Sequence, residues 1–242
     1  MTQPQSSPFR RVALIATGLF LMCGIAMLVD VEITKHRRSD YIPGDLRRIV
    51  QLCEIFAHGF GIALVLYVVW VVAPDKRKLL PRLAACAIVP GLVVQVCKLF
   101  VIRYRPAHFF PEYAQTLSET WIGVVAPGQL NFEYVTQSFP SAHAATAVGL
   151  ATGMIWLLPS CRNLFISLAF LASFQRIVAG AHWLSDVFAG AAVSAMVCGV
   201  IFYNRRVNSV FAKLENSDNQ SANVKGQFKV AEQPASESAK AA

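Results

Sequence analysis

Long apolar segments are the feature of this 242-residue chain that most restricts how it can fold. Several of them approach or exceed the ~18 residues needed to cross a bilayer. Because backbone polar groups have no water to bond inside lipid, each segment is expected to be a helix. The six predicted spans cover residues 12–29, 55–73, 83–102, 144–158, 164–180 and 183–203. The sequence therefore predicts an all-α, six-transmembrane helical bundle.

Composition agrees with a membrane protein and weakens other classes. Only 15% of the residues are charged, against about 25% in a typical soluble domain. The net charge of +8 is explained better by basic cytoplasmic loops than by nucleic-acid binding, since no nucleic-acid motif is present. The six cysteines form no CxxC pair and show no metal-ligand spacing. We expect neither a metal site nor a cofactor.

The basic residues of the short loops predict the orientation. Most lie in the N-terminal segment, in two inter-helix loops and after the last span, which places both termini in the cytoplasm: Arg10, Arg11, Lys76, Arg77, Lys78, Arg82, Arg162, Arg205, Arg206 and Lys213. The expected location is a bacterial inner membrane. The candidate functional residues described below would then face the periplasm or exterior. One outer loop departs from this rule, because it carries Lys35, Arg37, Arg38, Arg47 and Arg48. It is interpreted either as an interfacial segment or as a basic patch that attracts an anionic substrate.

The chain divides into three predicted parts. Residues 1–54 hold an N-terminal segment, the first span (a retained anchor rather than a cleaved signal peptide) and an outer loop. Residues 55–203 form the core, and residues 204–242 a disordered cytoplasmic tail, since 207–242 are too polar for a packed core. The segment 107–139 carries seven aromatic residues, which predicts an ordered loop at the membrane interface.

Charged residues at the ends of apolar spans are candidates for function, because burying a charge in a membrane is costly. Lys98 and Arg176 lie near the ends of the third and fifth spans, and His182 and Asp186 at the start of the sixth. Arg105 follows the third span and His143 precedes the fourth. In the predicted topology all these residues lie on the outer side. By contrast, Arg103 and His108 are interpreted as interfacial, and Glu54 with His58 as a pair used in helix packing.

Local spacing suggests how these groups would act. His182 and Asp186 are four residues apart, so on a helix they would share one face and the carboxylate would hold one imidazole nitrogen. Pro106 disfavours helix at Arg105, which directs this guanidinium into the loop. Ser141 and Ala142 lead into the fourth span, where backbone N–H groups at a helix start can bind an anion. Three cations, two histidines and this helix start suit a tetrahedral oxyanion such as phosphate.

Three sequence elements resemble the type 2 phosphatidic acid phosphatase (PAP2) superfamily over residues 55–203. The elements are KLFVIRYRP from Lys98, PSAH ending at His143, and QRIVAGAHWLSD from Gln175 to Asp186; they are similar to KxxxxxxRP, PSGH and SRxxxxxHxxxD. The sequence departs from these patterns where Ala142 replaces Gly and Gln175 replaces Ser. The methyl group of Ala142 is tolerable unless its φ is positive, and Gln175 can still form hydrogen bonds.

The resemblance implies a metal-independent phosphoric ester hydrolase that acts on lipid phosphates. His182 would be the nucleophile, Asp186 would orient it, and His143 would be the general acid and base. Lys98, Arg105, Arg176, Ser141 and Ala142 would bind the phosphoryl group. The expected partners are the membrane and a lipid phosphate of the phosphatidic acid, phosphatidylglycerol phosphate, prenyl pyrophosphate or lipid A type.

Two other classes remain open at this point. A haloperoxidase would bind vanadate in the same pocket and would be detected by vanadate-dependent halide oxidation. A transporter or structural membrane protein would release no phosphate and would tolerate substitution of His182. The sequence predicts neither the oligomeric state nor which lipid phosphate is used.

Overall fold

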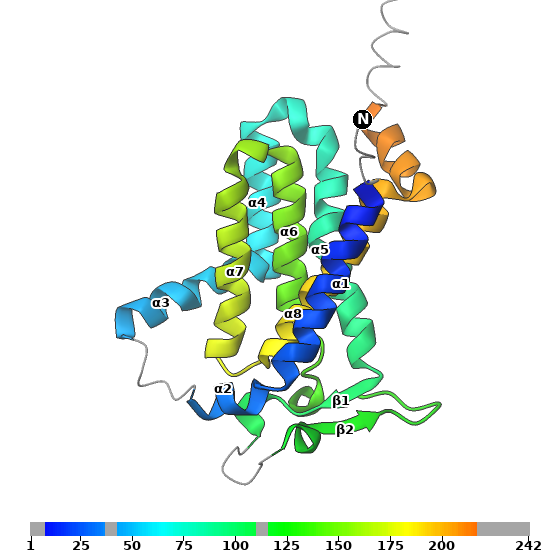
Figure 1. Cartoon of the computed structure of the whole chain (residues 1–242). Helices are drawn as coiled ribbons and strands as arrows, with labels where there is room; N and C mark the ends of the chain where they lie inside the picture. The colour runs from blue at the N-terminus through cyan, green and yellow to red at the C-terminus, as the bar shows by residue number, and fades with distance from the viewer. Residues whose placement is uncertain (1–7, 37–42, 110–115, 217–242) are drawn as a thin grey trace, which may run out of the picture.

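Six long helices run side by side in the computed structural model, which describes residues 8–36, 43–109 and 116–216 (Figure 1). These helices are α1 (Pro8–Met27), α4 (Gly59–Val72), α5 (Leu80–Lys98), α6 (Ala142–Leu157), α7 (Arg162–Val178) and α8 (Leu184–Tyr203). Helix α6 contacts α5, α7 and α8, while α1 packs along α8. The prediction of a helical bundle is thus confirmed.

Helix α6 lies at the centre of the bundle because small residues cover most of its surface. Ten of its 16 residues are buried, and most of these are Ala, Gly or Thr. Short side chains let neighbouring helices approach closely, as in other membrane bundles. Larger side chains fill the remaining space on the side of α5 and α7, where Leu83, Leu150, Met154 and Phe165 form part of one buried apolar cluster.

Six membrane spans were predicted, but fewer of the described helices are long and apolar enough to cross a membrane. Among the described residues, three helical stretches are long and apolar enough to cross a membrane, namely Pro8–Met27, Pro74–Lys98 and Leu184–Tyr203. A bent pair, Gly44–Ala57 with Gly59–Val72, would make a fourth. With 16 residues, α6 reaches only about 24 Å, which is less than the ~30 Å hydrocarbon core.

The predicted third span is too long at its C-terminal end. Helix α5 ends at Lys98, and the chain then forms strand β1 (Val101–Arg103), which pairs antiparallel with β2 (Trp121–Val124). The β-branched pair Val101–Ile102 suits a strand better than a helix. This hairpin and the short helices η4 (Pro106–His108), η5 (Leu117–Thr120) and η6 (Tyr134–Thr136) give the aromatic segment an ordered structure, apart from residues 110–115, which lie outside the described residues.

The predicted second span is also interrupted. Helix α2 (Asp30–His36) follows α1, and helix α3 (Gly44–Leu52) continues as η2 (Cys53–Ala57), which makes an angle of 69° with α4. Glu54 and His58 therefore do not share one helix face: Glu54 belongs to η2, and His58 caps α4 by accepting a hydrogen bond from the Phe60 N–H. Of the basic outer loop, residues 37–42 lie outside the described residues.

The opposite end of the bundle carries η3 (Pro74–Leu79), which contains Lys76, Arg77 and Lys78, and η7 (Pro159–Cys161), which Arg162 follows (Figure 1). Residues 205–216 form a further helix here, although they were predicted to be part of a disordered tail. Arg82 holds this helix, because its guanidinium pairs with Glu215 at 2.6 Å and donates to Asn208 at 2.7 Å. The remainder of the predicted tail, 217–242, lies outside the described residues.

Candidate active site

The predicted site residues lie at the end of the bundle that carries the β1–β2 hairpin. Six of them are buried and the other two, at the start of α6, are partly buried; the full set is Lys98, Arg105, Ser141, Ala142, His143, Arg176, His182 and Asp186. They come from α5, the loop after β1, the start of α6, the end of α7 and the segment from residue 182 into α8. Residues that are distant in sequence are thus gathered at one depth, as predicted.

A tight turn after α7 places His182. Gly180 has φ +68°, a left-handed conformation that glycine adopts without strain. The N–H groups of Ala181 and His182 both bond the carbonyl of Arg176, which closes the helix end. His182 consequently lies before α8 rather than on it, which corrects the prediction of a shared helix face. The pair still meets, since His182 Nδ1 is 3.5 Å from Asp186 Oδ2.

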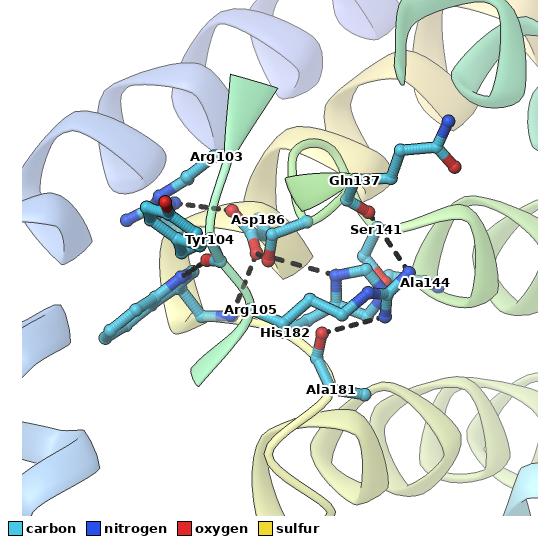
Figure 2. Close-up of polar contacts among 12 residues, drawn as sticks. Arg103, Tyr104, Arg105, Gln137, Ser141, Ala144, Ala181, His182 and Asp186 are labelled. Carbon is cyan, nitrogen blue, oxygen red and sulfur yellow. Dashed lines mark hydrogen bonds and ion pairs between the residues drawn. The ribbon is translucent and has the colours of Figure 1, made fainter. Parts of the chain in front are cut away.

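Asp186 is held by three donors in the interior. Its Oδ2 accepts hydrogen bonds from the Ser138 hydroxyl at 2.6 Å and from the Trp183 N–H at 2.9 Å. Its Oδ1 pairs with Arg103 NH1 at 2.5 Å. Figure 2 shows Asp186 between Arg103 on one side and His182 on the other. A fully buried carboxylate is acceptable in this position because it is paired and hydrogen-bonded.

Arg103 is buried inside the protein, although the sequence predicted an interfacial position for it. Its side chain is 0% exposed, and besides Asp186 it pairs with Asp30 at 2.7 Å and donates to the Ser185 hydroxyl at 2.7 Å. The rings of Trp121 and Trp183 lie 4.6 and 5.1 Å from its guanidinium carbon. Asp30 and Arg103 were missed as site residues. A carboxylate directly after the first apolar segment was the sequence signal that should have drawn attention to Asp30.

Arg105 leaves the helix and points into the loops, as predicted. Its guanidinium donates to three backbone carbonyls, those of Tyr134 at 2.9 Å, Ala181 at 3.0 Å and Gln137 at 3.1 Å. The Ala181 carbonyl directly precedes His182. Arg105 therefore links the turn that carries His182 to the loop before α6, which contains Tyr134 and Gln137 (Figure 2). Charge-assisted bonds of this kind are stronger than those between neutral groups.

Helix α6 begins at the PSAH element. Ser141 is its N-cap and accepts a hydrogen bond from the Ala144 N–H at 3.3 Å, while the Ser141 N–H donates to the Asp186 carbonyl at 3.0 Å. Among the described residues, positive φ angles occur at glycines and at no other residue. Ala142 therefore adopts its conformation without strain, and its methyl group is tolerated. The first N–H groups of a helix have no partner within the helix. Ser141 accepts a hydrogen bond from one of them, that of Ala144, and such a helix start is also a suitable place for an anion.

Glu54 of η2 contacts the cationic side of the site, and this contact was not predicted. Its Oε1 forms an ion pair with Arg176 NH1 and lies 3.6 Å from His143 Nε2. Its Oε2 accepts a hydrogen bond from Gln175 Nε2 at 3.1 Å. The interpretation of Glu54 and His58 as a packing pair is therefore wrong for Glu54, which belongs with the site residues.

Burial sets the charge state of His182. The side chain is 1% exposed, and burial lowers the pKa of His182 to about 4, although the nearby Asp186 acts in the opposite direction. The imidazole is thus neutral at pH 7. A neutral ring whose Nδ1 faces a carboxylate leaves the lone pair of Nε2 free, which is what a nucleophile requires.

Within 8–36, 43–109 and 116–216 there is no group of three or more His, Cys, Asp or Glu side chains placed to hold a metal ion. Besides the carboxylates of Asp186 and Glu54, the site contains three cations, Lys98, Arg105 and Arg176, gathered around two histidines. Such an arrangement can bind an oxyanion and transfer protons to and from it.

Comparisons with known proteins agree with this geometry. The family model of the PAP2 superfamily matches residues 79–209. A lipid A 1-phosphatase from Rhizobium etli is 31% identical over 147 residues, which cover 57% of this chain and 56% of that protein. The match thus spans about half the length of this relative. A decaprenylphosphoryl-5-phosphoribose phosphatase from Mycobacterium tuberculosis is 30% identical over 179 residues, which cover 73% of this chain and 88% of that protein.

A solved structure shows the same fold. The crystal structure of Aquifex aeolicus LpxE superposes with a TM-score of 0.53 at 23% sequence identity, over 72% of this chain and 93% of that one. The family model covers more than half of the present chain, and the three motif elements of the candidate site lie within its bounds. The chain therefore belongs to the PAP2 superfamily.

Proposed function

We propose that this membrane protein hydrolyses lipid phosphate monoesters or pyrophosphates through a phosphohistidine intermediate. The observation that carries the proposal is the pairing of a neutral, buried His182 with Asp186 beside a second histidine and three cations. The substrates in the names of the relatives, lipid A and a decaprenyl phosphate derivative, are also lipids that carry phosphate. Candidate substrates are therefore phosphatidic acid, phosphatidylglycerol phosphate, prenyl pyrophosphates and lipid A.

In the first step, His182 Nε2 attacks phosphorus and the bond to the leaving oxygen breaks. Asp186 holds Nδ1 and stabilises the imidazolium as it forms, the role of the carboxylate in hydrolase triads. His143, in its protonated form, gives its proton to the leaving alkoxide. Lys98, Arg105 and Arg176 stabilise the charge on the phosphoryl oxygens, together with the N-terminal end of α6 at Ser141 and Ala142.

In the second step, water hydrolyses the phosphohistidine. His143, now neutral, accepts a proton from the water as the oxygen attacks phosphorus. The N–P bond breaks, inorganic phosphate leaves, and His182 is neutral again. The cations keep the same positions through both steps, so most of the rate enhancement comes from positioning and charge stabilisation.

We further propose that all six long helices lie across the membrane, with the site at the outer interface. The basic residues of η3, of the start of α7 and of the helix 205–216 lie at the end opposite the site, which supports a cytoplasmic location for that end. Helix α6 need not reach the full bilayer thickness if its N-terminus lies in a site that also admits water. A lipid with its tail in the bilayer would then present its phosphate at the depth of His182.

The test is phosphate release by purified protein in detergent, with a panel of these lipids and with and without EDTA. His182→Ala should abolish release, whereas His108→Ala, which removes an exposed histidine of the same region, should leave it unchanged. Release that resists EDTA and depends on His182 would support the mechanism. Folded wild-type protein that releases no phosphate from any lipid, or a His182→Ala variant of full activity, would overturn it.

A further inference from the structure

The contacts of Glu54 extend the site beyond the three motif elements. Helix η2 packs against both α6 and α7, and it presents the Glu54 carboxylate to His143 of α6 and to Gln175 and Arg176 of α7. One oxygen, Oε1, meets Arg176 NH1 and His143 Nε2, the latter at 3.6 Å, while the other accepts from Gln175. These are the guanidinium assigned to the phosphate and the imidazole assigned to the leaving oxygen.

Gln175 is part of the same arrangement. Its side-chain nitrogen donates to Glu54 at 3.1 Å, and its side-chain oxygen accepts from Arg176 NH1 at 3.1 Å. A serine, the residue of the family pattern, is too short to bridge both groups in this way. The departure at Gln175 thus has a structural explanation, because it completes a triangle with Glu54 and Arg176.

The guanidinium of Arg176 is only partly used in this triangle. Both contacts involve NH1, whereas the buried Nε atom has no hydrogen-bond partner among the described residues. A buried donor without a partner is unfavourable, and a phosphate oxygen would accept a hydrogen bond from it on binding. Glu54 can therefore keep its contact with Arg176 while phosphate is bound.

Charge explains what Glu54 would do for His143. The groups that face this imidazole are Arg176 on α7, Lys98 on α5, His182 before α8 and His58 at the cap of α4. The positive charges of Arg176 and Lys98 repel a further positive charge on the ring. Glu54 is an acidic side chain that also faces it, at 3.6 Å. A general acid must carry a proton when the substrate binds, so a carboxylate at this position favours the reactive state.

We propose that Glu54 is a positioning residue, which fixes Arg176 and stabilises protonated His143 while Gln175 holds its second oxygen. This inference rests on the proposed function and adds to it a residue outside the family motifs. The alternative is that the carboxylate only occupies the phosphate site and must leave before substrate binds. The two predict opposite effects when the charge is removed.

The experiment measures kcat, KM and the pH profile of kcat/KM for Glu54→Gln, Glu54→Asp and Gln175→Ser. In Glu54→Gln, which keeps the size of the side chain, kcat should fall about 10- to 100-fold and the alkaline limb should move to lower pH by about one unit. Glu54→Asp retains the charge and should restore the position of that limb. Gln175→Ser should show a smaller loss of kcat in the same direction. Glu133→Gln, the same change at an exposed position near the site, should have no effect.

Two results would overturn the proposal. An unchanged kcat with an unmoved alkaline limb would show that Glu54 has no part in positioning. Tighter inhibition by inorganic phosphate at unchanged kcat would show that the carboxylate merely competes with the substrate. Wild type and His182→Ala are assayed in parallel. An inactive wild type would contradict both the proposed function and this inference. An active wild type with a Glu54→Gln variant of normal activity would contradict this inference alone.

Discussion

The individual residues of the site differ in how far the sequence could predict them. His143, His182 and Asp186 were identified because their spacing matches a known pattern and because charge at a span end is costly. Arg103 and Glu54 were misinterpreted, since their partners Asp30 and Arg176 are distant in sequence. Neither spacing nor composition predicts a contact between η2 and α7, which depends on the angle at which η2 leaves α4.

Burial of His182 leads to a prediction about its titration. Because burial lowers the pKa of His182 to about 4, the ring should stay neutral as the pH falls from 7 to about 5, whereas a free histidine gains its proton near 6.5. Its ring ¹⁵N signals, identified by their loss in His182→Gln, should move only below about pH 5. Movement centred near pH 6.5 would show that burial does not lower the pKa of His182.

Arg103 gives a prediction about stability. Arg103→Met keeps an apolar stem but leaves the buried carboxylates of Asp30 and Asp186 without their cation. Removing one partner from a buried ion pair costs about 3–5 kcal/mol, so the midpoint of thermal unfolding in detergent should fall by several degrees. The control is Arg48→Met, because Arg48 is 81% exposed in its pair with Asp45 and such pairs contribute about 0–1 kcal/mol. Equal midpoints in the two variants would argue against the buried network.

At the scale of elements, helices were predicted well and their ends were not. The length of the apolar segments indicated all six long helices. However, α5 ends at Lys98, four residues before the predicted end of the third span, and α4 begins at Gly59, four residues after the predicted start of the second span. Both errors lie at the site end of the bundle. There the chain leaves the helix to form β1 and η2, and both of these elements are stabilised by tertiary contacts that the hydropathy pattern does not contain.

The bend between η2 and α4 depends on a glycine, which provides a test at this scale. A Cβ atom at Gly61 would lie 1.8 Å from the carbonyl oxygen of Ile55, whereas one at Gly59 would meet nothing within 4 Å. Gly61→Ala should therefore push η2 away from α4, withdraw Glu54 from Arg176 and reduce kcat by a factor similar to Glu54→Gln. Gly59→Ala should retain full activity. If both variants keep the wild-type kcat, the close approach at Gly61 does not position Glu54.

The whole molecule is a bundle with two unlike ends (Figure 1). One end collects basic residues, among them Arg82, which lies under the rings of Trp156, Phe202 and Phe211 and holds the helix 205–216 through Glu215. The other end carries the hairpin, the aromatic segment and the site. The difference between the two ends was predicted from the sequence, because basic loops and motif residues alternate along the chain. It did not predict the helix 205–216, whose partner Arg82 is more than a hundred residues away.

These two ends allow the proposed orientation to be tested. In a background with the native cysteines replaced by serine or alanine, single cysteines are introduced at Gln129, exposed at the site end, and at Ser160, exposed in η7 at the basic end. A maleimide that cannot cross membranes should label Gln129→Cys in intact spheroplasts, and Ser160→Cys only after permeabilisation, because basic loops stay in the cytoplasm. The reverse pattern would place the site inside the cell. Labelling of both positions from the same side would mean that the bundle does not cross the bilayer, and the supply of substrate from the outer leaflet would then have no structural basis.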